Sequence, residues 1–503
     1  MKKAALVSGL LALSSVAALT AVGSSAEAAK PTLAAPAMTA SAATVAGLQP
    51  CEDLKALPTA RCGVLHLPLD RRNPAKGTTP IGFALIPHTD TSQPGLGTVV
   101  PNPGGPGDSA IDLSGDKFAA GFAPLSDRRD LLLIDPRGVG RSGPITCPAL
   151  AGSDRTFVGL ERQRAMIGEC GKQLGERLGD YGTAAFADDI DAVRARLGVD
   201  RLDLVGVSYG TYLMPVYAQR HPTHVRTISL AGAYAVNTDP VGTLDVAAFR
   251  RAVRLVCQRT EKCSGTTVLD DIAALAKRLR ANPARVDVTY EGTTHNVVLD
   301  EWRMTSTAAG VYSSAADTET ELALASAAAA ARRGNLEPLR ELVRKDLTKS
   351  AEALSYGSQL YSDTLSWAAT CHDYPRDFDY ADTVATRRAD YDRAQSHLST
   401  KDFAPFSPKV WVTRANYDTA GCLNWPNDPT AESPLPREAK LPNVPVLVLS
   451  GDLDANTSSA AGRQAAAQFP HAVFKEYKDV GHTPGTVPQG VVDIQSFIVA
   501  GRA

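Results

Sequence analysis

The residues best placed to do chemistry are a serine enclosed by two glycines, in the stretch Gly206-Val207-Ser208-Tyr209-Gly210. An apolar, strand-like run over residues 202–206 precedes this serine, and a helix-like run over residues 209–220 follows it. Small residues on both sides permit a sharp, strained turn that holds the hydroxyl out above the end of a sheet. Such a pattern also occurs by chance, but its position between a strand and a helix predicts that Ser208 is a nucleophile.

A serine hydroxyl is a weak nucleophile at neutral pH, so it needs a general base, and the base needs a carboxylate to orient it. After a strand–serine–helix turn, the acid comes next in the chain and the histidine comes last. One strand-like run leads into residues 451–454 and a later one leads into residues 479–482. We therefore predict His482 as the base and Asp454 as the orienting acid, with Asp452 as the alternative acid.

Acyl transfer also needs fixed N–H donors for the oxyanion that develops on the substrate. One donor is normally the backbone amide of the residue after the nucleophile, and the other comes from a loop after an early strand. The stretch Asn-Pro-Gly-Gly-Pro-Gly at residues 102–107 follows the apolar run 98–100 and occupies that place. We predict the amides of Gly105 and Tyr209 as donors, and an ordinary Gly/Pro turn is the alternative.

Strand-like and helical runs alternate on both sides of the serine turn, which predicts a mostly parallel α/β sheet. Residues 185–197 show the 4-3-4 apolar spacing of an amphipathic helix. Over residues 243–429 strand-forming runs largely disappear, and alanine-rich and charged helical stretches replace them. We therefore predict an α/β-hydrolase fold made of residues 47–242 and 430–503, interrupted by a helical cap insertion over residues 243–429.

The first residues predict export from the cell. Lys2 and Lys3 precede an apolar run that ends in an Ala-Glu-Ala site at residues 26–28, which is typical of a signal peptide over residues 1–28. A linker or pro-segment rich in Ala, Thr, Pro and Ser follows over residues 29–46. A membrane anchor is the alternative, which the Ser, Thr and Gly residues within the run disfavour. We expect a secreted protein with no membrane attachment after cleavage.

The charge balance excludes one class of partner. The formal net charge is −2 and no long Lys/Arg block occurs, whereas nucleic-acid surfaces need a clustered cationic excess. Nucleic acid is therefore not expected as a partner. The serine mechanism uses no metal and no cofactor, and we predict neither.

Eight cysteines, an even count, favour disulfides in an exported chain. About 105 pairings are possible, and the sequence alone does not choose among them. Buried free thiols would be unusual outside the cytosol, and a zinc cluster lacks paired C-x-x-C spacing. Pairing cysteines that are close in sequence gives the predicted set: Cys51 with Cys62, Cys147 with Cys170, Cys257 with Cys263, and the remaining Cys371 with Cys422.

Several motifs together resemble the proline-iminopeptidase group of serine exopeptidases. The resemblance is closer to secreted bacterial tripeptidyl aminopeptidases, whose C-terminal part carries a G-x-x-D-x-x-T stretch and a late Gly-His. It covers most of the chain from about Cys51 onward and is weakest across the insertion. The matching residues are Gly-Gly-Pro-Gly at 104–107, Asp-Pro-Arg-Gly-Val-Gly-Arg-Ser at 135–142, residues 206–210, Gly451 with Asp454 and Thr457, Gly481-His482, and the cysteine regions at Cys371 and 422–426.

The resemblance implies an α/β-hydrolase serine peptidase that releases short peptides, such as tripeptides, from a free N-terminus. Pro103 stands where iminopeptidases usually carry His, and Ser458 stands in place of a frequent Pro. Thr483-Pro484 also follows His482 instead of Gly-Thr. No triad position is lost, so these departures bear on substrate details more than on the reaction.

Two other functions stay open. A serine triad does not distinguish an amide from an ester, so the same residues would serve an esterase or lipase. A non-catalytic binding protein on a hydrolase scaffold is the third possibility, which the filled triad positions disfavour.

An exopeptidase, unlike an esterase, needs a countercharge for the α-ammonium group of its substrate. Asp373, two residues from Cys371 and beside Tyr374 and Pro375, is the predicted partner of that group, and an ordinary loop Asp is the alternative. The expected partners are therefore peptides with a free N-terminus, bound by a monomer.

Overall fold

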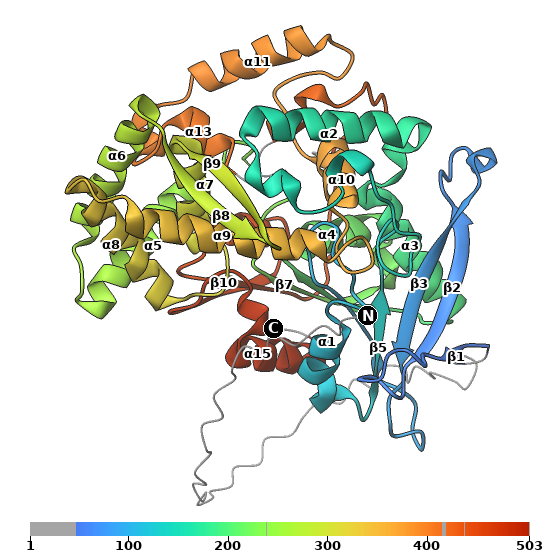
Figure 1. Ribbon diagram of the computed structural model, residues 1–503. Coiled ribbons are helices and arrows are strands. Elements are labelled where there is room, and N and C mark those ends of the chain that lie inside the picture. Colours follow the sequence, from blue (N-terminus) through green and yellow to red (C-terminus); the bar gives the residue numbers. More distant parts are fainter. Residues whose placement is uncertain (1–46, 238, 415–418, 437, 502–503) are drawn as a thin grey trace, which may run out of the picture. The chain divides into compact units, whose positions relative to one another are not determined.

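The computed structural model describes residues 47–501 apart from 238, 415–418 and 437 (Figure 1). The predicted signal peptide over residues 1–28 and linker over residues 29–46 lie outside the described residues. Among the helices that are described, none has the length and apolar character needed to cross a membrane.

Nine strands form one sheet in the order β1-β2-β3-β5-β4-β6-β7-β10-β11 (Figure 1). β1, β2, β3 and β5 pair antiparallel in that order. From β5 to β11 every neighbouring pair is parallel, so the predicted mostly parallel α/β sheet is confirmed. The strands are β1 Gln49–Pro50, β2 Arg61–Pro68, β3 Thr78–Ile86, β4 Gly97–Asn102, β5 Arg129–Ile134, β6 Leu202–Val207, β7 Val225–Ala231, β10 Val446–Gly451 and β11 Ala472–Tyr477.

Helices cover both faces of this sheet. Successive strand residues point to opposite faces, so Leu132 of β5 packs with the α3 and α4 side chains while Leu133 packs with those of α1 and α15. Burial on both faces explains why the parallel strands are near-continuous apolar runs. Helix α3 begins two residues before the predicted helix 185–197. The helices outside the insertion are α1 Gly115–Phe122, α2 Leu160–Leu174, α3 Thr183–Arg196, α4 Gly210–Arg220, α14 Ser459–Ala467 and α15 Pro488–Ala500.

The segment between β7 and β10 is mostly helical, but it also contains an antiparallel hairpin of β8 and β9 that the sequence analysis did not predict. Val286 and Val288 are buried and alternate with exposed residues, so the period-two signal of a strand was present within the helical surroundings. The exact limits of the insertion, 243 and 429, remain a prediction. The elements are α5 Thr243–Thr260, α6 Gly265–Ala281, β8 Ala284–Tyr290, β9 Thr293–Leu299, α7 Glu301–Val311, α8 Thr318–Arg332, α9 Glu337–Ser355, α10 Asp363–Asp373, α11 Val384–Ser396, α12 Thr400–Phe403 and α13 Pro408–Val412.

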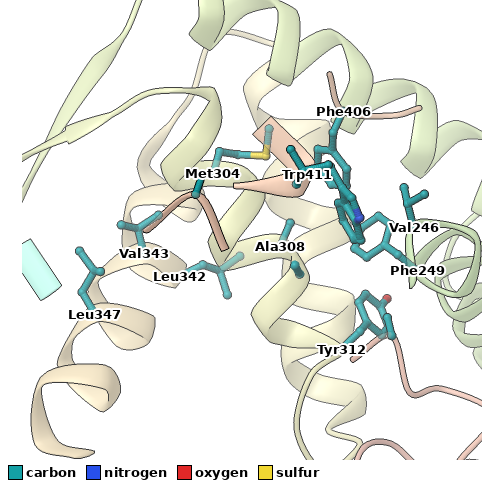
Figure 2. Close-up of a cluster of buried hydrophobic side chains, with 14 of the residues drawn as sticks. Val246, Phe249, Met304, Ala308, Tyr312, Leu342, Val343, Leu347, Phe406 and Trp411 are labelled. Carbon is teal, nitrogen blue, oxygen red and sulfur yellow. The ribbon is translucent and has the colours of Figure 1, made fainter. Parts of the chain in front are cut away.

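Large aromatic side chains fill the core of the insertion (Figure 2). Phe249 of α5 lies 5.2 Å from Phe406 and 6.1 Å from Trp411, measured between ring centroids. Tyr312, at the end of α7, meets Phe249 edge-on at 5.4 Å. Edge-to-face pairs add to the stabilisation that burial of the rings provides. The core therefore fixes the point at which the chain leaves α7.

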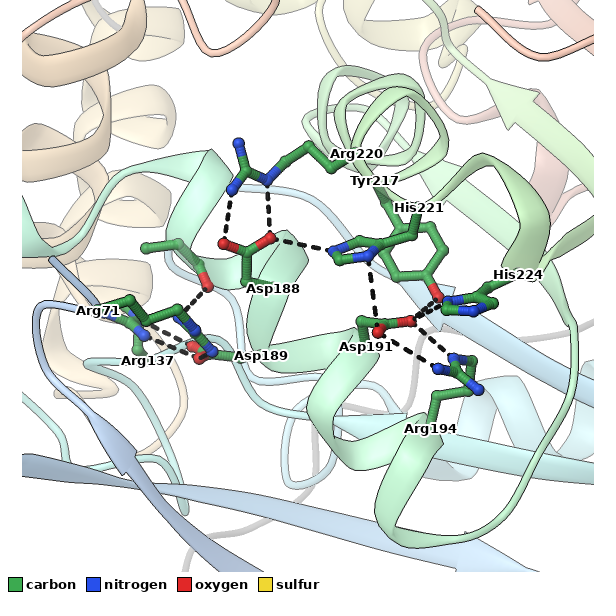
Figure 3. A network of polar contacts seen from close by, with 11 residues as sticks. Arg71, Arg137, Asp188, Asp189, Asp191, Arg194, Tyr217, Arg220, His221 and His224 are labelled. Carbon is green, nitrogen blue, oxygen red and sulfur yellow. Dashed lines mark hydrogen bonds and ion pairs between the residues drawn. The ribbon is translucent and has the colours of Figure 1, made fainter.

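A network of buried charges connects α3 to the loop after β5 (Figure 3). Nε and Nη2 of the buried Arg137 donate to the two carboxylate oxygens of Asp189 at 2.7 and 2.8 Å. Nη1 of Arg137 donates to the carbonyl oxygens of Leu69 and Asp180, both at 2.8 Å. Arg71 adds a third contact to the Asp189 carboxylate at 2.6 Å. The pair is stable only because each buried charge has these partners.

The eight cysteines form four disulfides, in the combinations that the sequence analysis predicted. Cys371, in α10, bonds to Cys422, in the 3-10 helix Thr419–Asn424. This bridge closes a loop of 51 residues within the insertion. Cross-links of this kind stabilise a fold by restricting the unfolded chain.

We predict that Asp189→Asn lowers the free energy of unfolding by about 3–5 kcal/mol, because an amide leaves the Arg137 charge buried without a counterion. Urea denaturation with the disulfides intact measures the loss. Asp200→Asn is the matched control, since Asp200 and its partner Arg201 are 65% and 55% exposed and such pairs contribute little. Equal effects of the two substitutions would contradict the structural role of the buried pair.

Candidate active site

Ser208 lies at a sharp turn between β6 and α4, with a positive φ of 53° that residues other than glycine seldom adopt. Close packing around the turn requires glycine on both sides. A Cβ on Gly206 would lie 2.3 Å from the carbonyl oxygen of Gly210, and one on Gly210 would lie 2.7 Å from the carbonyl oxygen of Asn102. The turn is also held by the amide of Ser208, which donates to the carbonyl of Ala231 at 3.0 Å.

The structure brings His482 and Asp454 to this serine. Nε2 of His482 lies 2.9 Å from the Ser208 hydroxyl, and Nδ1 lies 3.1 Å from Oδ2 of Asp454. Asp454 follows β10 and His482 follows β11, so both loops leave the same edge of the sheet as the serine turn. The carboxylate fixes Nδ1 as the protonated nitrogen, which leaves Nε2 free to accept the serine proton.

Thr457 connects the acid and the base. Its hydroxyl donates to Oδ2 of Asp454 at 2.7 Å and lies 2.9 Å from Nδ1 of His482. In the sequence this threonine stands out only as part of a family motif, because a hydroxyl three residues after an acid carries no signal of such a contact. Thr457 therefore orients both side chains at once.

Asp454 is buried and ionised. Burial alone would raise the pKa of Asp454, but electrostatic attraction to the His482 ring and hydrogen bonds from His482 and Thr457 hold this pKa below its ordinary value. Its other oxygen accepts from the backbone amides of Asn456 and Thr457 at 2.7 and 2.9 Å. Asp452, the alternative acid, points elsewhere, because it pairs with Arg259 and accepts from the amide of Asp479 at 2.9 Å.

The glycine-rich loop packs directly on the serine turn. A Cβ on Gly104 would lie 2.8 Å from the carbonyl oxygen of Val207 and 3.0 Å from Cβ of Ser208. The amide of Gly104 donates to the side chain of Asn102 at 3.1 Å. By contrast, within the described residues no acceptor binds the amide of Gly105 or of Tyr209. The two predicted oxyanion donors are thus unoccupied beside the nucleophile.

The insertion contacts the site from two sides. Residues 312–316, which follow the insertion core, bind the loops of the acid and the base: the carbonyls of Tyr312 and Ser314 accept from the amides of Ala455 and His482, both at 2.9 Å. Residues 360–362 bind the glycine-rich loop, since the amide of Ser109 donates to the carbonyl of Leu360 at 2.9 Å. The insertion is therefore part of the framework that positions the reacting groups.

The carboxylate of Asp373 already has partners within the protein, which argues against its predicted role as the partner of a substrate ammonium group; that role stays a prediction. Its carboxylate is buried, with Oδ2 accepting from the amide and hydroxyl of Thr183 at 2.7 and 2.5 Å. Oδ1 lies 2.6 Å from Nδ1 of His372. Asp373 satisfies the first amide of α3 and is a structural residue.

In the part of the chain that the structure describes, one group of potential metal ligands is Asp191, His221 and His224, with ligand atoms within 4.8 Å of one another (Figure 3). Oδ1 of Asp191 already lies 2.6 Å from Nε of Arg194 and 2.7 Å from Nδ1 of His224. A guanidinium on the carboxylate disfavours a second cation there. We therefore interpret the group as a polar contact between α3 and the end of α4.

The sequence of this chain is similar to a known protein family and to several known proteins. A model of the alpha/beta hydrolase fold family matches residues 97–485. The chain is 34% identical over 197 residues to serine protease Hip1 of Mycobacterium tuberculosis, an alignment that covers 36% of this chain and 37% of that protein. It is 33% identical over 183 residues to tripeptidyl aminopeptidase of Streptomyces lividans, covering 33% and 34%. It is also 30% identical over 210 residues to carboxylesterase B of M. tuberculosis, covering 38% and 39%. The chain spans little more than a third of the length of the curated relatives it matches.

We predict that Thr457→Val lowers kcat/KM about tenfold with any substrate, because the hydrogen bond from the Thr457 hydroxyl to Asp454 and its contact with His482 are lost. Hydrolysis of 4-nitrophenyl acetate measures the effect. Thr457→Ser keeps the hydroxyl and is expected to retain most of the activity. A serine variant as slow as the valine variant would show that the methyl group, and not the hydroxyl, matters.

Proposed function

The chain belongs to the α/β-hydrolase fold family, and from that membership we propose that it is a secreted serine exopeptidase that releases short peptides, such as tripeptides, from free N-termini. One observation carries the serine-hydrolase chemistry of this proposal: the Ser208 hydroxyl lies 2.9 Å from Nε2 of His482. Behind that histidine lies Asp454, which is buried and ionised. A nucleophile, a base and an orienting acid in this order are what acyl transfer requires.

In the proposed mechanism, Oγ of Ser208 attacks the scissile carbonyl carbon while Nε2 of His482 takes the hydroxyl proton. Asp454 stabilises the resulting imidazolium, and the amides of Gly105 and Tyr209 donate to the oxyanion. The tetrahedral intermediate then collapses, the C–N bond breaks, and His482 gives its proton to the leaving amine. Water, activated by His482, hydrolyses the acyl-enzyme and restores the serine.

Peptide substrates are supported by the names of two relatives, serine protease Hip1 and tripeptidyl aminopeptidase. An ester substrate is the second candidate, because a third relative is named carboxylesterase B and the geometry at Ser208 suits either bond. The insertion supports the exopeptidase. Its segments 312–316 and 360–362 border the site on both sides and would restrict the passage of a long chain.

Secretion is supported by the disulfides. Four bridges persist in oxidising compartments and are rare in the cytosol. The predicted signal peptide over residues 1–28 would deliver the chain to such a compartment. A monomer stays a prediction.

We predict that Ser208→Ala lowers kcat by about 10⁴- to 10⁶-fold and abolishes labelling by a fluorophosphonate probe, because the Ser208 hydroxyl is the group that accepts the acyl chain in the proposed mechanism. Gel detection of the probe and a chromogenic ester measure both effects. Ser92→Ala, on an exposed loop, is the control and should behave as the wild type. Labelling that persists without the Ser208 hydroxyl would place the nucleophile elsewhere.

We predict that the wild-type protein cleaves a tripeptide 4-nitroanilide with a free N-terminus at least about tenfold faster than the N-acetylated form, because acetylation removes a charge-assisted contact. A panel that adds 4-nitrophenyl esters separates the two candidate functions. Fast ester hydrolysis with no cleavage of either anilide would replace the exopeptidase with the esterase.

A further inference from the structure

Asp108 directly follows the glycine-rich loop that carries the Gly105 amide. The loop turns back on itself here, because a Cβ on Gly105 would lie 3.0 Å from the backbone nitrogen of Asp108. When the reach of the Asp108 side chain is included, the Asp108 carboxylate lies at most about 10 Å from the Gly105 amide. This is about the length of three extended residues. Asp108 is thus close to the proposed oxyanion donors without being one of them.

The direction of the Asp108 side chain follows from its pairing with the insertion. Asp108 and Tyr361 form an antiparallel bridge. The hydrogen bonds run between their neighbours, from the amide of Ser109 to Leu360 and from the amide of Ser362 to Gly107, both at 2.9 Å. In such a non-hydrogen-bonded pair the two facing side chains lie on the same side and close together. Asp108 therefore points along Tyr361.

The neighbouring residue points the other way. The Ser109 hydroxyl donates to Asp135 at 2.8 Å, at the end of the sheet. Because successive side chains of an extended segment alternate, the Asp108 carboxylate lies on the opposite side, away from Asp135. That side is shared with Tyr361 of the insertion. The carboxylate is therefore placed between the glycine-rich loop and the insertion.

In the part of the chain that the structure describes, no group uses this carboxylate. Within the described residues neither a backbone amide nor a side chain donates a hydrogen bond to Asp108, and no cation lies within ion-pair distance of it. Asp135, by contrast, accepts from Ser109, Ile111 and Arg141. Burial raises the pKa of Asp108 to about 6, and the positive charge of Lys117 offsets this only in part. An acid that is desolvated and unpaired gains from a cationic ligand.

We propose that Asp108 binds the α-ammonium group of the peptide substrate, which rests on the proposed exopeptidase function. The ammonium group of a short acyl segment lies within about three extended residues of the oxyanion, which is within reach of the Asp108 carboxylate. The charge that was expected in the insertion at Asp373 is thus supplied by the glycine-rich loop. A longer N-terminal segment would carry its ammonium group past Asp108, so this contact also selects short products.

The test compares Asp108→Asn with the wild type on three substrates: a free tripeptide 4-nitroanilide, its analogue with hydrogen in place of the α-amino group, and 4-nitrophenyl acetate. For the free peptide we expect kcat/KM to fall about ten- to a hundredfold, mainly through KM, as for loss of a charge-assisted contact. The des-amino peptide and the ester should change less than about twofold. Asp116→Asn, an exposed acid on α1, makes the same charge change and should leave all three rates unaltered.

Several outcomes would overturn the proposal. An equal loss on all three substrates, or slower fluorophosphonate labelling, would show that Asp108 shapes the loop and does not bind the ammonium group. Unchanged kinetics with the free peptide would show that the group is bound elsewhere. If the wild type hydrolyses only the ester, the exopeptidase function fails and the role of Asp108 fails with it. If the wild type cleaves the free peptide and Asp108→Asn cleaves it at the same rate, only the proposed role of Asp108 fails and the exopeptidase function stands.

Discussion

The site depends on one backbone constraint, the positive φ of 53° at Ser208. A non-glycine residue in this region costs about 1–3 kcal/mol and persists only where the surroundings leave no alternative. Here the surroundings are backbone atoms of β4, β6 and α4 packed so closely that Gly206 and Gly210 have no room for a side chain. The base and the oxyanion donors can act only if the hydroxyl is held in this fixed position.

Most of the fold and three residues of the site could be predicted from local sequence. The three residues could be predicted because each of them follows a buried strand. Parallel strands end at one edge of the sheet, so Ser208, Asp454 and His482 could be brought together from chain order alone. Asp454 was predicted over Asp452, which lies in the same short loop, and the hydrogen bonds in the structure distinguish the two acids.

Other features have no local signal. Asp373 is bound to Thr183, which is 190 residues away in the chain, and no pattern around residue 373 reveals that contact. The β8–β9 hairpin has a strand pattern, but it lies among helical stretches. The whole insertion was therefore predicted to be helical. Asp108 was passed over because an acid after a Gly/Pro loop is ordinary; only its lack of partners in the folded chain is unusual.

The segment 312–316 holds the loops of the acid and the base through the carbonyl oxygens of Tyr312 and Ser314, not through side chains. Carbonyl groups are the same in every residue, so most substitutions at residues 313–316 preserve the two contacts, whereas Tyr312 is also held by its ring against Phe249. An inserted or deleted residue in this segment moves both carbonyls relative to Ala455 and His482. It would thus disturb the site although the segment is far from Ser208 in the sequence. The length and path of this segment are therefore under constraint, while the identities of residues 313–316 are comparatively free to change.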